Sequence, residues 1–321
     1  MIKSDIAAIL GAVVLVVAAA PTYAQSYPAK PVRLVVPFLA GGNTDRITRA
    51  LADSLTKTFN QQFIVDNRPG AGGAIGAEAV AKSPPDGLTL LVCAVGFVIT
   101  PHLQKVGYDP FKEFIPISNI ASNSSVLTVN TNVPVKNLRD FIDYAKGNPG
   151  KITYGSAGNG SFSHITTELF AMRAGLKLTH VPYKGGPQAT ADLVSGQLNA
   201  YFGNAPDVVP HSKTGRVLLI AVSSARRDKA LPDLPAISES YAGFAAVGWN
   251  AMLAPVGTPR EIVDRLSAEV QKAVRDPAMI IRLEQMAVDA VGSTPQELAE
   301  TLRADYKIYG DVVKAAGLAG G

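Results

Sequence analysis

The residues best suited to binding chemistry lie in loops that join an apolar strand to a helix. The first such loop contains Gly41 and Gly42, after the apolar run Val32–Pro37 and before a helical stretch. Free N–H groups and the positive dipole end at a helix start favour negative charge, and glycines let a ligand approach the main chain. The loop is therefore a candidate anion site, although the pattern alone also fits an ordinary tight turn.

A second loop of the same kind runs from Tyr154 to His164. It offers glycines and hydroxyl groups at Gly155, Ser156, Gly158, Gly160, Ser161 and Ser163. Its glycine spacing is not that of the dinucleotide-binding fingerprint, and no acidic residue at the expected strand end supports that reading. Two anion sites that faced each other would clamp one ligand between them.

A third glycine-rich run, Asn67–Gly76, also lies between a predicted strand and a predicted helix. It reads either as a flexible connection or as a further part of the ligand site. Arg68 has the chemistry to meet a ligand carboxylate, but an exposed loop arginine is more often solvated or paired within the protein.

Catalytic patterns are missing from the sequence. Neither Ser156 nor Ser161 sits in a Gly-x-Ser-x-Gly elbow, and the four histidines show no zinc-ligand spacing. Cys93 lies in an apolar stretch and is expected to be a buried thiol. We therefore expect no enzyme activity, no metal and no cofactor. A secreted hydrolase remains a distant alternative, and His164, at the start of a glycine-loop helix, is the histidine to watch.

Composition narrows the class further. The chain has 321 residues, 47% of them hydrophobic and 17% charged, which describes a globular protein with a sizeable core. The formal charge is +4, and no run rich in lysine and arginine occurs. This argues against nucleic acid as a partner and agrees better with a weak attraction for small anions.

The N-terminal residues differ from the rest. An apolar run from Ile6 to Ala20 follows Lys3 and precedes small residues up to Ala24. This is typical of a cleaved signal peptide over residues 1–24, with an uncleaved anchor as the alternative. We expect an exported, soluble mature chain, and its single cysteine excludes an intramolecular disulfide.

The elements that must position the loops alternate between strand and helix. Strands are predicted at 32–37, 63–67, 88–94, 125–129, 151–154, 178–181, 198–202 and 217–222, and helices at 44–59, 74–81, 138–146, 163–174, 187–195 and 207–213. This alternation predicts an α/β doubly wound architecture. Two more helices are expected after Thr258-Pro259 and Thr294-Pro295, each with a glutamate three residues after the capping threonine.

Several longer motifs in the same order give the chain a family resemblance. They are Tyr27–Phe38 (YPAKPVRLVVPF), Ala40–Asp45 (AGGNTD), Asp66–Gly73 (DNRPGAGG), Pro85–Gly87 (PDG), Tyr154–Gly158 (YGSAG), His180–Gly185 (HVPYKG) and Ala254–Pro259 (APVGTP). From about Tyr27 to the C-terminus, the sequence resembles the Bug (TctC) family of periplasmic solute receptors that serve tripartite tricarboxylate transporters.

The resemblance implies a type II periplasmic-binding-protein fold, in which two α/β domains close by a hinge on an organic carboxylate. Domain I would take residues 25–124 plus 241–321, and the inserted domain II residues 125–240. The implied partners are a small organic carboxylate and the transporter's membrane subunits, with the receptor itself a monomer in the periplasm. A sensor that presents the ligand to a signalling receptor is the alternative.

The resemblance also implies the site residues. They are Phe38, Ala40, Gly41, Gly42, Asn43, Gly70 and Ala71 in the first domain, and Ser156, Ala157, Gly158, Ser161, His164, Tyr183 and Asn204 in the second. Asp45 is expected to be structural, because its carboxylate would repel an anion and can pair with Arg49 one helical turn later.

The chain departs from the family pattern at the presumed cleft wall. Pro187 stands one position early, Gly203 replaces a frequent aspartate beside Asn204, and Thr100 replaces a common asparagine. The identity of the ligand therefore cannot be carried over from a relative.

Overall fold

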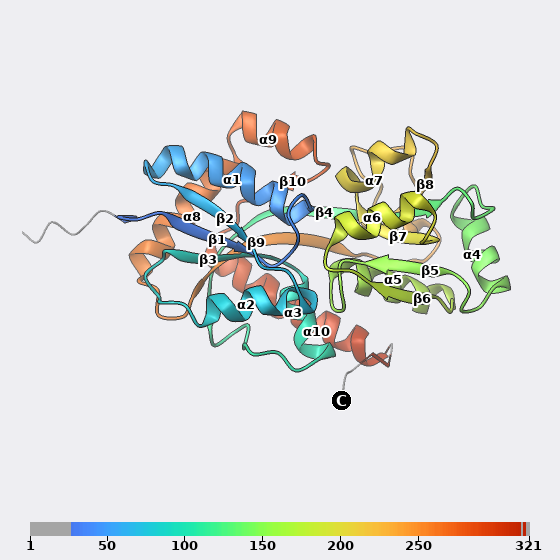
Figure 1. Cartoon of the computed structure of the whole chain (residues 1–321), viewed down its shortest axis with the longest axis horizontal. Coiled ribbons are helices and arrows are strands. Elements are labelled where there is room, and N and C mark those ends of the chain that lie inside the picture. The colour runs from blue at the N-terminus through green and yellow to red at the C-terminus, as the bar shows by residue number, and fades with distance from the viewer. Residues whose placement is uncertain (1–26, 316, 319–321) are drawn as a thin grey trace, which may run out of the picture.

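The computed structural model describes residues 27–315, 317 and 318. The predicted signal peptide, residues 1–24, lies outside the described residues. The chain forms two lobes joined by two long strands (Figure 1). We call the part that contains β1 the first lobe and the part that contains β5 the second lobe.

The first lobe is built on a parallel core of three strands. β1 (Val32–Val36) pairs in parallel with β2 (Phe63–Asn67) and with β3 (Thr89–Ala94). Between them lie α1 (Asn43–Phe59), a 3-10 turn at Ala71–Gly73, and α2 (Ala74–Ala81), followed by α3 (Gly96–Leu103). β1 buries Val32, Leu34 and Val36 on one face and Val35 on the other, because helices cover both sides of the sheet, and only Arg33 is exposed.

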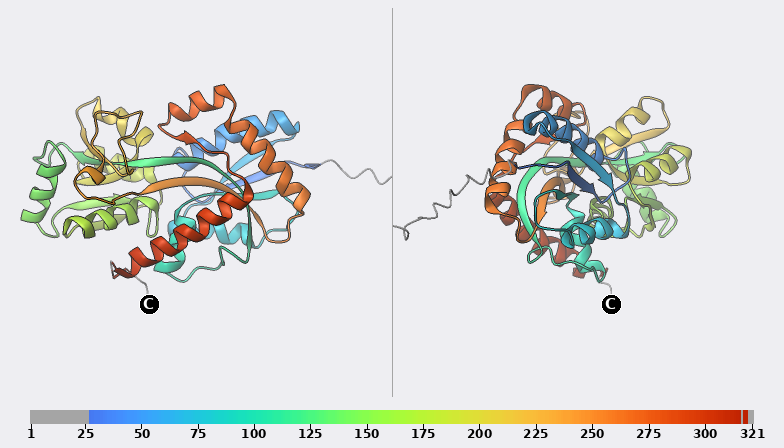
Figure 2. Two further views of the ribbon diagram at one scale, coloured as in Figure 1. Left: turned by 180° about the vertical axis from the view of Figure 1, so that it is seen from behind. Right: turned by 60° about the vertical axis from the view of Figure 1, so that its left-hand side comes forward.

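Helices cover the two faces of this sheet with separate apolar clusters. α1 buries Ile47, Leu51 and Leu55, which recur at helical spacing, in the cluster that α8 (Arg260–Val274) also joins. On the other face, α2, α3 and α10 (Pro295–Ala315) form a second cluster. Figure 2 shows α10 running along the back of the molecule.

Two antiparallel strands, which we call the crossing strands, lie where the two lobes join, and the longer one takes part in the sheets of both lobes. They are β4 (Phe114–Asn130) and β9 (Val247–Pro255). The first part of β4, up to Ser124, pairs with β9, and the remainder from Ser125 pairs with β7 and β8. One strand thus leaves the sheet of the first lobe and enters that of the second at Ser124–Ser125. Sequence reading missed both β9 and the first half of β4.

The second lobe repeats the strand and helix alternation. It contains α4 (Leu138–Gly147), β5 (Thr153–Ser156), α5 (Phe162–Ala174), β6 (Thr179–Pro182), α6 (Gly186–Ser195), β7 (Ala200–Asn204), α7 (Ala205–Ser212) and β8 (Val217–Val222). β5 pairs in parallel with β6 and β7. The described strands follow the order β2-β1-β3-β9-β4-β7-β5-β6, and the predicted α/β architecture is confirmed.

The C-terminal segment returns to the first lobe. It comprises α8, α9 (Pro277–Glu284), the short β10 (Asp289–Ala290) and α10. The predicted capping box at α10 is present, because Thr294 Oγ1 accepts from Glu297 N–H and the Glu297 carboxylate accepts from Thr294 N–H. The predicted cap of α8 is wrong: Thr258 donates its hydroxyl to the Pro255 carbonyl, and Pro259 becomes the N-cap.

Candidate functional site

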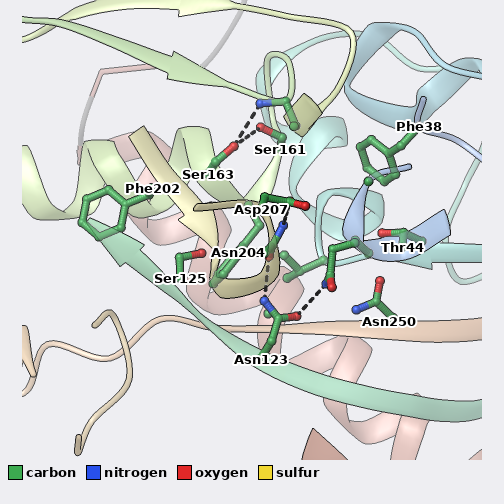
Figure 3. A pocket seen from close by; sticks show the side chains of 18 of the residues that line it. Phe38, Thr44, Asn123, Ser125, Ser161, Ser163, Phe202, Asn204, Asp207 and Asn250 are labelled. Atoms are coloured by element: carbon green, nitrogen blue, oxygen red, sulfur yellow. Dashed lines mark hydrogen bonds between the residues drawn. The ribbon is translucent and has the colours of Figure 1, made fainter. Parts of the chain in front are cut away.

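A cavity of about 70 Å³ lies between the two lobes, where both crossing strands pass. Its polar lining consists of Asn43, Thr44, Asn123, Ser125, Ser161, Ser163, Asn204, Asp207 and Asn250. Its aromatic lining consists of Phe38, Phe162, Tyr201, Phe202 and Trp249. Figure 3 shows several of these side chains converging from both lobes. We call this space the central cavity.

The N-terminus of α1 reaches the central cavity from the first lobe. Its N-cap, Gly42, has extended backbone angles and no side chain that could accept a hydrogen bond from the first N–H groups of the helix. Gly41 adopts a positive φ of 84°, and its N–H donates to Asp45 Oδ2 at 2.8 Å. Because the first N–H groups of a helix lack intrahelical partners, this end of α1 is suited to an anion.

Asp45 stabilises the loop before α1 through hydrogen bonds on the side away from the central cavity. Burial would raise the pKa of Asp45, but hydrogen bonds from Arg49, Gly41 and Asn67 hold it below its usual value. The Arg49 Nε to Asp45 Oδ2 distance is 2.9 Å. A charged, fully engaged carboxylate in this position serves to shape the loop.

The N-terminus of α5 reaches the same cavity from the second lobe. Ser161 is its N-cap and accepts from His164 N–H at 3.4 Å. Ser163 Oγ accepts from Ala157 N–H at 3.0 Å and lies 3.1 Å from Ser161 Oγ. Two helix starts with amide and hydroxyl donors therefore meet at the cavity from opposite lobes.

Two stacked histidines lie behind the α5 loop. The rings of His164 and His180 are 4.1 Å apart, and burial lowers the pKa of His164 to about 3 and that of His180 to about 4. The neutral His164 Nδ1 accepts from Gly160 N–H at 3.2 Å, and His180 Nε2 lies 2.6 Å from Ser156 Oγ. Ser156 is fully buried, so this contact supports the loop and does not present a nucleophile to the cavity.

A chain of hydrogen bonds crosses from one lobe to the other beside the cavity. Asn43 Nδ2 donates to Asn123 Oδ1 at 3.2 Å, and Asn123 Nδ2 donates to Asn204 Oδ1 at 2.7 Å. Asn204 Nδ2 in turn donates to Asp207 Oδ2 at 3.3 Å. Arg46 of α1 completes the path, with Nη2 3.4 Å from Asp207 Oδ1. Figure 3 shows the part that joins Asp207, Asn204 and Asn123.

Asp207 is the acidic member of this chain of hydrogen bonds. Burial raises the pKa of Asp207, while Arg46 and the hydrogen bond from Asn204 act in the opposite direction. Its side chain is only 3% exposed, whereas that of Arg46 is 40% exposed. Arg46 thus approaches the carboxylate from the solvent side, and the described residues that line the cavity include no lysine, arginine or histidine.

Two amide oxygens at the cavity have no hydrogen-bond partner. Asn43 and Asn250 are 7% and 1% exposed, and the Oδ1 atom of each is buried and unpaired. Buried acceptors of this kind are uncommon, because each loses its hydrogen bonds to water without replacement. Both residues belong to the lining, at the start of α1 and in β9.

A second cavity of about 170 Å³ adjoins the first at Phe38 and Ala157. Gly70, Ala71, Gly158 and Tyr183 line it. The lobes touch at this point: a Cβ on Gly72 would lie 1.9 Å from the Asn159 carbonyl oxygen. The described arrangement is therefore a closed one.

The structure distributes the predicted site residues over two cavities and two positions outside them. Those at the central cavity are Phe38, Gly42, Asn43, Ala157, Ser161 and Asn204. Those at the second cavity are Gly70, Ala71, Gly158 and Tyr183, together with Phe38 and Ala157. Ala40 and Gly41 are exposed in the first loop, and Ser156 and His164 are buried behind the second. Their part in binding stays a prediction.

Sequence reading missed the residues contributed by the crossing strands and by α7. Asn123, Ser125 and Asn250 lie in β4 and β9, and Asp207 lies in the first turn of α7. A signal was available in the polar run Ser122–Ser125, which interrupts an otherwise apolar segment. Within the described parts of the chain, no helix is long and apolar enough to cross a membrane, and no group of acidic, histidine and cysteine side chains is placed to hold a metal.

Comparison with known proteins gives a consistent result. Residues 47–318 match the family model of the tripartite tricarboxylate transporter family receptor, TctC. Protein BugT of Bordetella pertussis is 33% identical over 306 residues, which cover 93% of each chain.

Two solved structures are similar over nearly their whole length. The R. palustris protein Rpa4515 with adipate is 35% identical with a TM-score of 0.89, covering 92% of this chain and all of the other. MatC from Rhodopseudomonas palustris with bound malate is 29% identical with a TM-score of 0.83, covering 89% of this chain and all of the other. The two-domain, type II periplasmic-binding fold expected from the sequence is thereby confirmed.

Proposed function

The chain belongs to the tripartite tricarboxylate transporter receptor family, TctC, whose members are periplasmic solute-binding proteins, and on this premise we propose its cargo and its partner. The protein binds a small organic carboxylate in the central cavity and delivers it to the membrane subunits of a transporter. It acts as a monomeric carrier and not as an enzyme.

The observation that carries the proposal is the meeting of two helix N-termini at one cavity. The uncapped start of α1 and the serine-rich start of α5 come from different lobes. Free amides, serine hydroxyls and two dipole ends stabilise one carboxylate without a basic side chain. The adipate of the Rpa4515 structure and the malate bound to MatC agree with this ligand class.

The closing motion follows from the path of the chain. We propose that domain I comprises residues 25–124 and 241–321 and domain II residues 125–240, with β4 and β9 as the hinge. This division is supported by the change of partners in β4 at Ser124–Ser125. Opening the hinge would separate the two helix starts and release the carboxylate.

A thermal-shift panel tests the binding step. Protein stripped of ligand by unfolding and refolding is mixed with di-, tri- and aromatic carboxylates, and with neutral sugars and amino amides as controls. A carboxylate present at a hundred times its Kd stabilises the folded state by about 2.7 kcal/mol, which raises Tm by several degrees. The proposal fails if no carboxylate raises Tm while neutral compounds do.

An uptake assay tests the delivery step. Cells that contain the transporter's membrane subunits but lack the receptor are given the labelled carboxylate identified by thermal shift. Expression of the wild-type receptor is expected to restore uptake. Restored binding in the periplasm without uptake would favour a sensor over a transport receptor.

A further inference from the structure

The wall of the central cavity formed by Asp207, Asn43 and Asn250 is rich in hydrogen-bond acceptors, and the Nδ2 donor of Asn43 is already bonded to Asn123. Asn43 Oδ1 and Asn250 Oδ1 are buried without partners, and Asp207 offers a carboxylate. A carboxylate has about four lone-pair positions, of which the contacts to Asn204 and Arg46 use two. This wall therefore leaves acceptor positions unpaired in the closed protein.

The chain of amide side chains determines which atoms remain without a hydrogen-bond partner. An ionised Asp207 only accepts hydrogen bonds, so Asn204 must turn its Nδ2 toward Asp207. That turns Asn204 Oδ1 toward Asn123 Nδ2, and Asn123 Oδ1 toward Asn43 Nδ2. The atom left at the end of the chain is Asn43 Oδ1, an acceptor, and rotating one amide would put two like atoms face to face.

The charge of the cavity lining disfavours a second carboxylate at this wall. Among the described lining residues Asp207 is the only charged one, and Arg46 meets it from the solvent side. A ligand with a carboxylate at each end would place its second negative charge near an acid, with no cation in the lining. A ligand with one carboxylate at the two helix starts has no such conflict.

We propose that this wall recognises a nitrogen-bound hydrogen-bond donor, so that the cargo is a carboxylate whose other end is a carboxamide or an ammonium group. The donor occupies the acceptor positions of Asp207, Asn43 and Asn250, while the carboxylate occupies the helix starts. This inference rests on the proposed function, and it narrows the class of ligand from organic carboxylates in general to those that also carry a donor.

Matched probes separate charge from hydrogen bonding. Succinate, glutarate, adipate and terephthalate are each compared with their monomethyl ester and their monoamide. Ester and amide have the same charge and similar size, but only the amide donates. Calorimetric titration measures Kd for every probe, on protein freed of ligand by unfolding and refolding.

The expected result is that, on the carbon skeleton that fits best, the monoamide binds at least about tenfold tighter than the monomethyl ester. Asp207→Asn is expected to reduce this ratio to below about threefold. Arg46→Gln, which keeps the carboxylate, retains the ratio, and so does Asp53→Asn, which removes an acid paired with Arg282 within the first lobe. Because the readout is a ratio within one variant, a general loss of stability or closure cancels.

The possible outcomes are distinct. If esters or diacids bind as tightly as amides, the donor inference is overturned while the carboxylate function stands. If Asp207→Asn leaves the affinity ratio of monoamide to monomethyl ester unchanged, Asp207 does not bind the donor group of the ligand. If no member of any set binds, both the proposed function and this inference fail. The wild-type ratio decides the main point even if the Asp207 variant does not fold.

Discussion

Arg46 of α1 and Asp207 of α7 form an ion pair that joins the two lobes, with 3.4 Å between Nη2 and Oδ1. Arg46 Nη1 also donates to the Pro206 carbonyl at 3.5 Å. The acidic partner is buried and belongs to the cavity lining, while the basic partner is half exposed. The pair can exist only when the lobes are close, so it links ligand binding to closure.

Removing the cation of this pair should weaken ligand binding. Arg46→Gln leaves Asp207 without its counter-ion in the closed form, whereas in an open form water would solvate the carboxylate. Since the arginine is half exposed, we expect a modest loss of about 1 kcal/mol, or roughly fivefold in Kd. Calorimetric titration with the tightest carboxylate measures the change. Arg282→Gln is the control, since it removes an ion pair to Asp53 within the first lobe; equal losses in both variants would contradict the interlobe role.

A methyl group at Gly72 should prevent closure. A Cβ at this position would lie 1.9 Å from the Asn159 carbonyl oxygen of the other lobe, and the φ of 65° adds backbone strain. Gly72→Ala is expected to weaken carboxylate binding at least about tenfold and to enlarge the radius measured by small-angle scattering with ligand present.

Gly215→Ala is the matched control for this substitution. Gly215 has a φ of 69°, but a Cβ there would have no neighbour within 4 Å. Both variants should lose about 1–2 kcal/mol of stability from the left-handed backbone. Unimpaired binding by Gly72→Ala would show that the contact between Gly72 and Asn159 is not needed for the bound state.

Two substitutions at Ser161 should separate helix capping from ligand binding. Ser161→Ala removes the N-cap of α5 and is expected to cost about 1 kcal/mol of unfolding free energy. Ser161→Asp provides an equally good cap, so its stability should stay near that of the wild type. However, it places a negative charge in the cavity lining, and we expect at least a tenfold loss of carboxylate affinity. Chemical denaturation and calorimetry measure the two effects, and undiminished binding by Ser161→Asp would place the anion elsewhere.

The single tryptophan provides a direct probe of the cavity. Trp249 belongs to the cavity lining, is 4% exposed, and donates its indole N–H to Asp305 Oδ2 at 2.7 Å. Ligand entry is therefore expected to change its fluorescence intensity or emission maximum in a saturable titration. Trp249→Phe should abolish the signal and still bind by calorimetry. A wild-type emission spectrum that stays constant at saturating ligand would contradict placement of the ligand in this cavity.

Local sequence patterns predicted most strands and helices of the two lobes, because each of these elements shows its hydrophobic periodicity within a short segment. The run Val32–Pro37 and the spacing of Ile47, Leu51 and Leu55 on α1 each show their periodicity without reference to distant residues. By contrast, β9 is a strand because it pairs with β4, more than a hundred residues earlier in the chain, and its Gly248 and Asn250 interrupt the apolar pattern. β9 and the first half of β4 were missed for this reason, and with them Asn250 and Asn123.

The two buried histidines should make stability depend on acid pH. The folded-state pKa of His164 is about 3 and that of His180 about 4, because burial disfavours the charged rings, while an unfolded histidine titrates near its usual value of 6.5. Between these values the unfolded state binds more protons than the folded state. Stability contributed by the neutral rings is therefore complete above about pH 6.5 and is lost as the pH falls toward 4, with a slope of at most about 1.4 kcal/mol per pH unit for each histidine.

His164→Asn isolates the contribution of one ring. The Asn Oδ1 takes a place similar to that of His164 Nδ1 and can still accept from Gly160 N–H, but the side chain does not titrate. Other groups titrate in the same range, so the informative quantity is the difference between wild type and variant. Denaturation curves measured from pH 7 to pH 4 should show a smaller loss of stability for His164→Asn. Parallel curves for the two proteins would mean that His164 is not held neutral in the folded state, and the stacked pair would then not be the acid-sensitive support of the α5 loop.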